Sequence, residues 1–385
     1  MLTHTLGSRA RLGVLGILCL MLAACSSTPP PIIVCGDANG GQCTNPDAHI
    51  YATTTSNQIL SFSVSSASGA LTTLTPTAGP ANSSSVANVG LFLMFADPST
   101  NQVDSYQING DGTLMSVPGS PFALGTAAGG PTSIMAAPFG FFYATEPDGT
   151  IAGFSAPGNG TLTGAVPNSP FAAGIAPAQM AVAALSASAP APIALYATGG
   201  GPNGGILAYT VDSAGSLSLI TGSPFAVLPD WSAGSVVVAS PYVLALFTSN
   251  AAATNFGKVA ALSIDLNTGA LTSVPGSPFA VGNAPAALAI DSSNHLFVLS
   301  SADHTVSAFG IGSNGVLTPI GTPVAAGTAT SGMALFPPYL YVADTTASSI
   351  LIFNIAPTTG AVTAAGSMSV ASPPRQLTVV NFPLI

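Results

Sequence analysis

Three acidic residues end strand-like apolar runs at corresponding places of the chain. Asp97, Glu146 and Asp344 close the segments LFLMFAD, FGFFYATE and LYVAD. Acids at equivalent places of a repeat could surround a cation, or one of them could act as a general base. Each could instead cap its own turn through hydrogen bonds from side chain to backbone. Glu146 is the only glutamate of the chain and is therefore the first catalytic candidate.

Two further positions could bind a ligand. Arg375 could hold a carboxylate or polarise a carbonyl oxygen, or it could be a surface residue beside the end of the chain. Asp230 and Trp231 lie together in LPDWSAG, a segment rich in turn-forming residues. A tryptophan in such a loop can stack on a sugar ring or can cover the core.

The histidines and serines give little indication of chemistry. His49 and His295 begin strands, and we expect them on the face opposite to the acids. Asp303 and His304 are adjacent and could be a catalytic pair or an ordinary surface pair. The chain contains no G-x-S-x-G elbow between a strand and a helix, and no H-E-x-x-H, P-loop or Rossmann fingerprint. We therefore predict no metal site and no cofactor.

A repeat rich in glycine and proline positions these residues. The segment GALTSVPGSPFAVG at 269–282 matches GTLMSVPGSPFALG at 112–125 in 11 of 14 positions. Looser copies of its opening recur 43 to 55 residues apart, starting at Gly69, Gly112, Gly160, Gly215, Gly269, Gly315 and Gly360. Short strands repeated with this period predict an all-β fold, a seven-bladed β-propeller.

Each repeat contains four strand-like segments, which we expect to form one antiparallel blade. The first blade, residues 49–75, contains only three of them. The segment RQLTVVN at 375–381 follows the seventh blade and has no blade of its own. We therefore predict that it pairs beside residues 49–54 and closes the ring, which removes the exposed sheet edges.

The PGSPF element follows the fourth strand of several repeats. We expect its prolines to end that strand and its phenylalanine to pack between neighbouring blades. The same position holds Phe122, Phe171, Phe225 and Phe279, with Val324 in the sixth repeat.

The N-terminal segment predicts export. Arg9 and Arg11 precede the apolar run LGVLGILCLML, and the segment ends in Leu-Ala-Ala-Cys25. This resembles the bacterial lipobox, so we expect a signal peptide at 1–24 and a lipid on Cys25 that holds the protein in the cell envelope, at the outer membrane. An ordinary cleaved signal is the alternative. Residues 25–48 would form a tether, and Cys35 and Cys43 in its Gly-rich loop are expected to form a disulfide, leaving the propeller as residues 49–385.

Composition limits the partners. Charged residues make up 4% of the chain, and after the signal peptide only Lys258 and Arg375 remain against 13 acidic residues. Nucleic acid is excluded as a partner, since phosphate binding needs many cations. The predicted surface is polar but uncharged.

The strand and turn motifs carry a family resemblance. LYVADTTASSILIFNIAPTTGAVT and its copies resemble the lactonase family of seven-bladed propellers, whose named member is 6-phosphogluconolactonase. The resemblance covers roughly residues 49–385 and is clearest from Gly257 onward. It implies lactone hydrolysis at the centre of the ring, and it transfers no catalytic residue.

Two functions follow from these observations. The scarcity of Lys, Arg, His and Glu favours a binding or scaffold module that recognises a glycan, a peptide or a protein on one face. The alternative is a hydrolase of a neutral lactone or ester, because few cations are available to bind a phosphorylated sugar.

Overall fold

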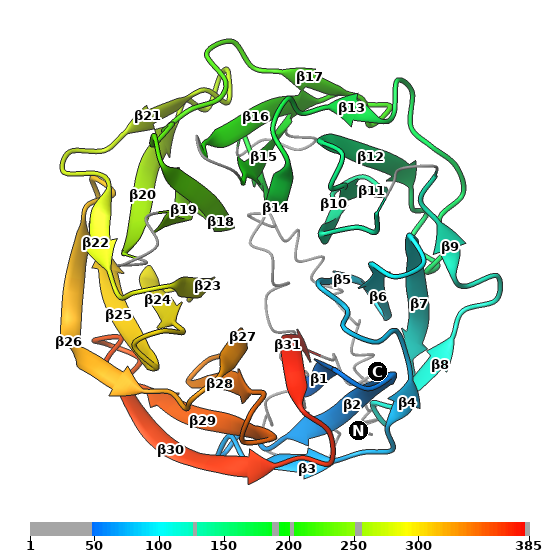
Figure 1. The fold of residues 1–385 in the computed structure, drawn as a ribbon, viewed down its shortest axis with the longest axis vertical. Helices are drawn as coiled ribbons and strands as arrows, with labels where there is room; N and C mark the ends of the chain where they lie inside the picture. The colour runs from blue at the N-terminus through cyan, green and yellow to red at the C-terminus, as the bar shows by residue number, and fades with distance from the viewer. Residues whose placement is uncertain (1–47, 126–128, 187–191, 201–203, 251–255, 382–385) are drawn as a thin grey trace, which may run out of the picture.

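The computed structural model describes residues 48–125, 129–186, 192–200, 204–250 and 256–381. Over these ranges 31 strands form seven sheets of four or five strands. Figure 1 shows the sheets as blades around a central axis. The prediction of an all-β, seven-bladed propeller is confirmed.

The predicted signal peptide, the lipidated Cys25 and the Cys35–Cys43 disulfide lie outside the described residues. Within the described ranges, no helix is long and apolar enough to cross a membrane.

Every blade is ordered from the centre of the ring outward. Blade 1 consists of β31 (Pro374–Asn381), β1 (Ala48–Thr54), β2 (Gln58–Val64) and β3 (Leu71–Thr73), with β4 (Thr77–Ala78) also on β2. Blade 2 consists of β5 (Val86–Val89), β6 (Phe92–Asp97), β7 (Gln102–Ile108) and β8 (Leu114–Ser116), with β9 (Phe122–Ala123) also on β7. Blade 3 consists of β10 (Ser133–Ala137), β11 (Phe141–Thr145), β12 (Thr150–Ser155) and β13 (Phe171–Ala172).

The remaining blades follow the same order. Blade 4 consists of β14 (Pro177–Ala184), β15 (Ile193–Gly199), β16 (Ile206–Val211) and β17 (Leu217–Leu219). Blade 5 consists of β18 (Trp231–Ala239), β19 (Tyr242–Ser249), β20 (Gly257–Ile264) and β21 (Leu271–Ser273), with β22 (Phe279–Val281) also on β20. Blade 6 consists of β23 (Pro285–Ile290), β24 (His295–Ser300), β25 (Thr305–Ile311) and β26 (Leu317–Ala325), and blade 7 of β27 (Thr330–Phe336), β28 (Tyr339–Asp344), β29 (Ser349–Ile355) and β30 (Val362–Ser369).

The two ends of the propeller close the ring as predicted. β31 pairs antiparallel with β1, with Ile50 opposite Val379 and Ala48 opposite Asn381. In Figure 1 the red β31 lies beside the blue β1 at the centre of blade 1. The C-terminal strand therefore supplies the innermost strand that the first repeat lacks.

The core lies between the blades. Among the described residues the buried apolar side chains form seven clusters, and each cluster joins two neighbouring blades. The second strands are buried on both sides, so β24 and β28 are buried throughout, whereas the outermost β26 is mostly exposed. Near-continuous apolar runs are expected for strands that are covered on both faces.

The PGSPF element does more than end a strand. Val117–Pro121 bulges away from β7, and the chain then returns to it as β9. Inside the bulge the Ser120 hydroxyl accepts a hydrogen bond of 2.8 Å from the backbone N–H of Ser105. Ser169, Ser223 and Ser277 make the same bond in blades 3, 4 and 5 at 2.9 to 3.0 Å. The serine hydroxyl thus gives a hydrogen-bond acceptor to a backbone N–H of the third strand at the point where the pairing with the outermost strand is interrupted.

Three of the four phenylalanines pack between blades as expected. Phe171 belongs to the cluster between blades 3 and 4, and Phe225 and Phe279 pack against the next two clusters. One expected strand differs: residues 160–166 of blade 3 form only the single bridge Phe154–Ala165. Gly164, with φ at +150°, lies directly before that bridge.

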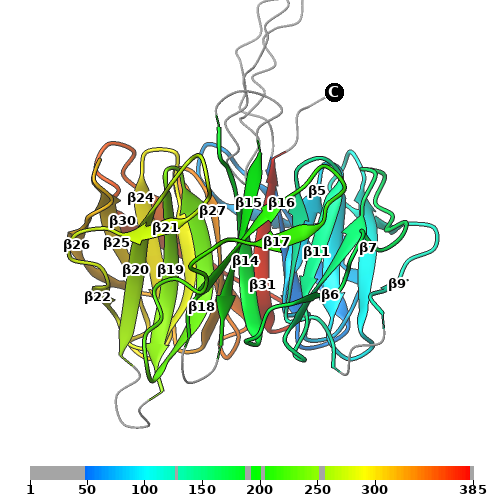
Figure 2. The same cartoon turned by 90° about the horizontal axis from the view of Figure 1, so that it is seen from above.

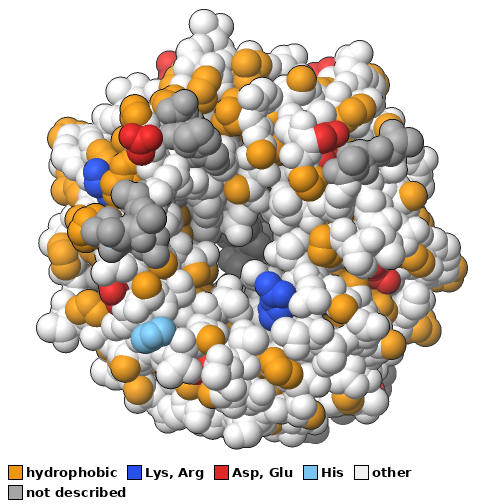
Figure 3. Space-filling view, in the orientation of Figure 1, with side chains coloured by type: hydrophobic (Ala, Val, Ile, Leu, Met, Phe, Trp, Pro, Cys, Tyr) orange, Lys and Arg blue, Asp and Glu red, His pale blue; other side chains and the backbone are white. Residues whose placement is uncertain are grey.

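The ring has two faces with different loops. We call front face the one that carries the connections between blades and the turns from second to third strands. The back face carries the other two kinds of turn. Figure 2 shows the strands running from one face to the other, and Figure 3 views the front face.

On the back face one contact recurs between blades. The glycine before each outermost strand lies against a side chain at the start of a neighbouring second strand, as Gly160 does against Phe92. At four junctions a tyrosine hydroxyl donates to the glycine carbonyl at 2.7 to 2.9 Å: Tyr51 to Gly112, Tyr143 to Gly215, Tyr196 to Gly269 and Tyr341 to Gly69.

Candidate functional site

The three candidate acids lie at the front-face ends of second strands. Asp97 ends β6, Glu146 follows β11 and Asp344 ends β28. The repeat therefore gives them equivalent positions in blades 2, 3 and 7. Their side chains nevertheless have different surroundings, and these differences decide what each can do.

Asp97 caps its own turn. Its carboxylate accepts hydrogen bonds from the Ser99 N–H at 2.9 Å and from the Thr100 hydroxyl at 2.7 Å. Partial burial raises its pKa, but the hydrogen bonds from Ser99 and Thr100 outweigh burial, so the net pKa is lowered. An anion held in this way is a poor general base.

Asp344 is buried, with 3% exposure, and holds two segments together. One carboxylate oxygen accepts from the Thr328 N–H at 2.9 Å, and the other accepts from the Ala347 N–H at 3.1 Å. Thr328 lies in the connection from blade 6 and Ala347 in the turn after β28. Asp344 therefore has a structural role in this loop arrangement.

Glu146 is the exception. It is 1% exposed, and neither carboxylate oxygen has a hydrogen-bond partner among the described residues. Burial, and secondarily the charge of Asp148, raises the pKa of Glu146 to about 7. A carboxyl that titrates near neutral pH can accept or donate a proton there.

Arg375 lies near the start of β31, at the centre of the ring. Its Nη1 donates to the Asn82 side-chain oxygen at 2.8 Å. Figure 3 shows a basic group at the edge of the central hollow on the front face.

The hydroxyls around this opening hold neighbouring blades together. Ser84 donates to the Pro131 carbonyl at 2.9 Å and Thr132 donates to the Pro177 carbonyl at 3.1 Å. Ser331 and Thr345 of blade 7 donate to the carbonyls of Arg375 and Pro374 at 3.1 and 2.8 Å. These four hydroxyls are engaged in structural contacts and are poorly placed to act as nucleophiles.

Trp231 begins β18 rather than lying in a loop, and Lys258 covers one side of it. The Lys258 Nζ lies 4.4 Å from the centroid of the indole ring, which is a cation–π contact. The Asp230 carbonyl accepts from the Asn250 N–H at 2.8 Å, and Asp230 has a φ of +64°. Stacking of a sugar on the covered side of Trp231 would require Lys258 to move.

Asp303, which precedes His304, makes structural contacts. The Asp303 carboxylate accepts from the Asn283 N–H at 2.7 Å and from the Asn283 side-chain amide at 2.8 Å. The adjacent aspartate therefore serves to join the connection between blades 5 and 6 to the turn after β24.

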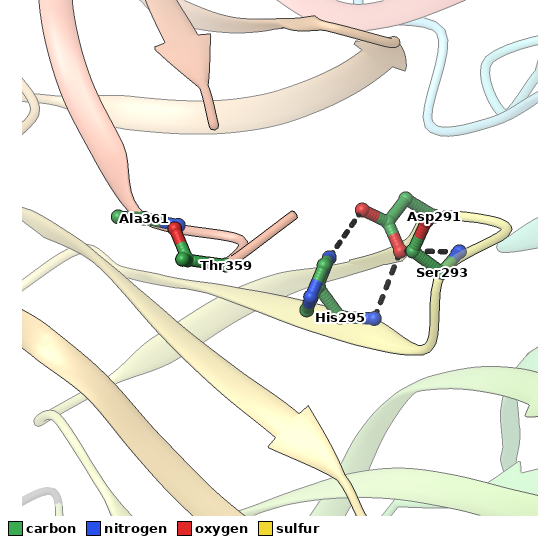
Figure 4. Close-up of polar contacts among 5 residues, drawn as sticks. All are labelled: Asp291, Ser293, His295, Thr359 and Ala361. Carbon is green, nitrogen blue, oxygen red and sulfur yellow. Dashed lines mark hydrogen bonds and ion pairs between the residues drawn. The ribbon is translucent and has the colours of Figure 1, made fainter. Parts of the chain in front are cut away.

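Sequence reasoning missed a histidine–aspartate pair on the back face. His295 Nδ1 lies 2.7 Å from the Asp291 carboxylate, which also accepts from the backbone N–H groups of Ser293 and His295, as Figure 4 shows. The ring packs against the turn containing Gly360 of blade 7. The DSSNH spacing of four residues was the available signal, and it indicates a turn cap rather than an active site.

Asp104 was also missed. It lies in the middle of β7, where the other blades carry small or apolar residues. Burial, and then the nearby charge of Asp97, raises its pKa to about 6. An aspartate inside a strand was the available signal. Among the described residues, no group of three or more His, Cys, Asp or Glu side chains could hold a metal ion.

Comparison with known proteins supports the fold. No family model and no curated protein sequence matches the chain. The periplasmic gluconolactonase PpgL of Pseudomonas aeruginosa superimposes with a TM-score of 0.70 at 16% identity, over 88% of this chain and 100% of that one. "A putative 6-phosphogluconolactonase" of Bacteroides fragilis gives 0.70 at 18% identity, over 88% and 99%. A protein of the same description from Bacteroides uniformis gives 0.71 at 16%, over 87% and 100%.

These identities establish a shared fold and nothing finer. The chain is a seven-bladed β-propeller of the lactonase-like kind.

Proposed function

We propose that this protein is a binding module of the cell envelope, and that its front face takes up a carboxylate-bearing glycan or peptide through Arg375. The observation that carries the proposal is the position of Arg375 near the start of β31, the innermost strand of blade 1, where Asn82 holds its guanidinium at Nη1. An arginine presents five N–H donors in a planar fork, which matches a carboxylate, and Asn82 occupies one of its nitrogens.

The other candidate groups support a binding role. The carboxylates of Asp97 and Asp344 are engaged by hydroxyl and backbone donors of nearby turns, and hydroxyls around the opening link the blades. The net charge of −9 would repel an anionic ligand at long range. At physiological ionic strength this repulsion is screened beyond about 8 Å, so local contacts with Arg375 decide binding.

The proposal is tested by calorimetry with trigalacturonate, its methyl ester and a peptide with a free C-terminal carboxylate. We expect one of the free acids to bind, the methyl ester to bind at least tenfold more weakly, and R375A to lose binding. K258A is the matched control, since Lys258 is the other cation of the described chain and is paired with Trp231. Equal losses in R375A and K258A, or no binding of any carboxylate, would contradict the proposal.

A second function, hydrolysis of a neutral lactone or ester, is favoured by Glu146. Its carboxyl is buried, has no partner among the described residues and has a pKa of about 7, which suits a general base near neutral pH. The fold is also that of a named gluconolactonase. Turnover of glucono-δ-lactone that is lost in E146Q and kept in D97N would favour this function; a rate equal to buffer would exclude this substrate.

The location in the envelope is part of the proposal. The lipobox-like sequence before Cys25 supports attachment to a membrane through a lipid on that cysteine. Labelling of the bacterial protein with radioactive palmitate should mark the wild type and not C25A. Unlabelled wild-type protein recovered from the medium would indicate an ordinary cleaved signal instead.

A further inference from the structure

One side-chain position that faces the gap between neighbouring blades varies around the ring. Opposite the start of each third strand, blades 2 to 5 place a phenylalanine: Phe122 faces Val103, Phe171 faces Ile151, Phe225 faces Ile206 and Phe279 faces Val259. In blade 7 the same register places Met368 opposite Ile350. In blade 1 this register places Thr77 opposite Ile59, and Tyr106 of blade 2 packs in the same cluster as Ile59 and donates its hydroxyl to the Ala78 carbonyl at 2.9 Å.

Blade 6 places a smaller residue there. Val324 pairs with Val306 in the register in which Phe279 pairs with Val259. The segment before it is also shorter, because Gly321–Pro323 replaces the four residues Pro275–Pro278. The chain therefore loses most of an aromatic ring between blades 6 and 7.

A cavity occupies this place. Its volume is about 220 Å³, and its lining includes Val306, Ala308, Ile320 and Val324 of blade 6 with Ala361 and Val362 of blade 7. Val306, Ala308 and Val362 are buried and form its floor, while Gly321 and Thr322 are exposed at its mouth. The pocket is open to solvent on one side, and its volume is enough for one benzene-sized ring.

The filled blades indicate the shape of the missing group. In blades 2, 4 and 5 the phenylalanine ring lies over the glycine of its own bulge, with Cε1 3.2 to 3.7 Å from the place where a Cβ on Gly119, Gly222 or Gly276 would be. Gly321 is the bulge glycine of blade 6, and it lines the cavity. The space in blade 6 therefore corresponds to the place that a flat phenylalanine ring fills in blades 2, 4 and 5.

We propose that this slot between blades 6 and 7 binds a small uncharged aromatic molecule of the size of phenol. The ring would lie against Gly321 and on the buried floor, and a polar substituent would point to the exposed Thr322. None of the lining residues carries a charge, so an aromatic carboxylate would lose hydration without gaining a counter-ion. This site lies at the outer part of the ring and is separate from the opening beside Arg375.

The test uses the whole protein with its Ala and Val methyl groups labelled, and phenol as the probe. We expect saturable NMR shifts at the Ala308 and Val306 methyls, with benzoate and cyclohexanol binding at least tenfold more weakly. V324F should fill the slot and abolish the shifts. F279V should open an equivalent slot in blade 5, so phenol would then also shift the methyl groups of Val259 and Ala261.

Three results would overturn the proposal. They are no saturable shift with phenol, equal shifts in wild type and V324F, or equal affinity for phenol and benzoate. Equal affinity for cyclohexanol would overturn the aromatic assignment. If V324F does not fold, as judged by circular dichroism, two other variants test the proposal. V324L should weaken phenol binding, and F279V should gain a second site.

Discussion

The two faces of the propeller differ in how regular their contacts are. On the back face the same contact recurs between blades: a glycine lies against the start of a neighbouring second strand, often with a tyrosine hydroxyl on its carbonyl. On the front face one repeat position holds a turn cap at Asp97, a bridge between two segments at Asp344, and at Glu146 a buried carboxyl that has no hydrogen-bond partner among the described residues. The back-face contact thus repeats from blade to blade, whereas the side chain at the front-face position has different contacts in different blades.

The strongest test of the back-face contact is G160A. Gly160 has a φ of +80°, and a methyl group there would overlap the Phe92 ring. The left-handed conformation costs about 1 to 2 kcal/mol for an L residue and overpacking about 1 to 3 kcal/mol, so we expect a loss of about 2 to 5 kcal/mol. Urea unfolding measures this loss.

Gly158 supplies the matched control in the same turn. Its φ is +84°, and nothing lies within 4 Å of the position of an added Cβ. G158A should therefore lose only the conformational cost of about 1 to 2 kcal/mol. If both variants lose the same amount, the packing of Phe92 on Gly160 contributes nothing measurable.

On the front face the largest expected effect is the pH dependence caused by Glu146. Its folded pKa is about 7, raised from 4.5 by burial and by Asp148, so the folded protein holds a proton that the unfolded chain has lost. The free energy of unfolding should therefore fall as pH rises from about 4.5 to 7, by about 3 kcal/mol, and stay level above that range. Urea unfolding between pH 4 and 8 measures it.

E146Q should remove this slope, because an amide does not titrate in this range. Above pH 7 the variant should be more stable than the wild type, since it buries no charge. Parallel pH profiles for the two proteins would show that Glu146 is solvated or paired in solution, and would weaken its candidacy as a general base.

A smaller effect is expected at the tyrosine of the back face. The Tyr196 hydroxyl donates to the Gly269 carbonyl at 2.9 Å, whereas the equally buried Tyr209 hydroxyl has no hydrogen-bond partner among the described residues. Y196F should cost about 1 to 2 kcal/mol, because it leaves a buried carbonyl unpaired. Y209F should be neutral or stabilising, and equal losses in both would remove the hydrogen bond as the cause.

The repeated features of the fold could be predicted from the sequence. Gly160 and its equivalents, the pairing of residues 375–381 with the first blade and the interblade phenylalanines follow from spacing alone. The partners across blades did not, because Tyr196 and Gly269 lie 73 residues apart. Nor could the sequence tell Glu146 from Asp97, because their burial depends on neighbouring loops and not on their common place in the repeat.

The smallest expected effect is that of Asp97, whose influence on the pH dependence of stability has the opposite sign to that of Glu146. The pKa of Asp97 is lowered because the hydrogen bonds from Ser99 and Thr100 outweigh its partial burial. The Asp97 carboxylate therefore adds to the free energy of unfolding above its unfolded pKa near 4, and this stabilisation is lost as pH falls through the lower folded pKa.

D97N should cost less than about 1 kcal/mol at pH 7, since solvent screens this half-buried turn, and the difference from wild type should shrink below pH 4. The Glu146 effect changes between pH 4.5 and 7 in the opposite direction. A D97N difference that grows as pH falls would mean that the carboxylate is destabilised in the folded protein, and Asp97 would then resemble Glu146 as a candidate for proton transfer.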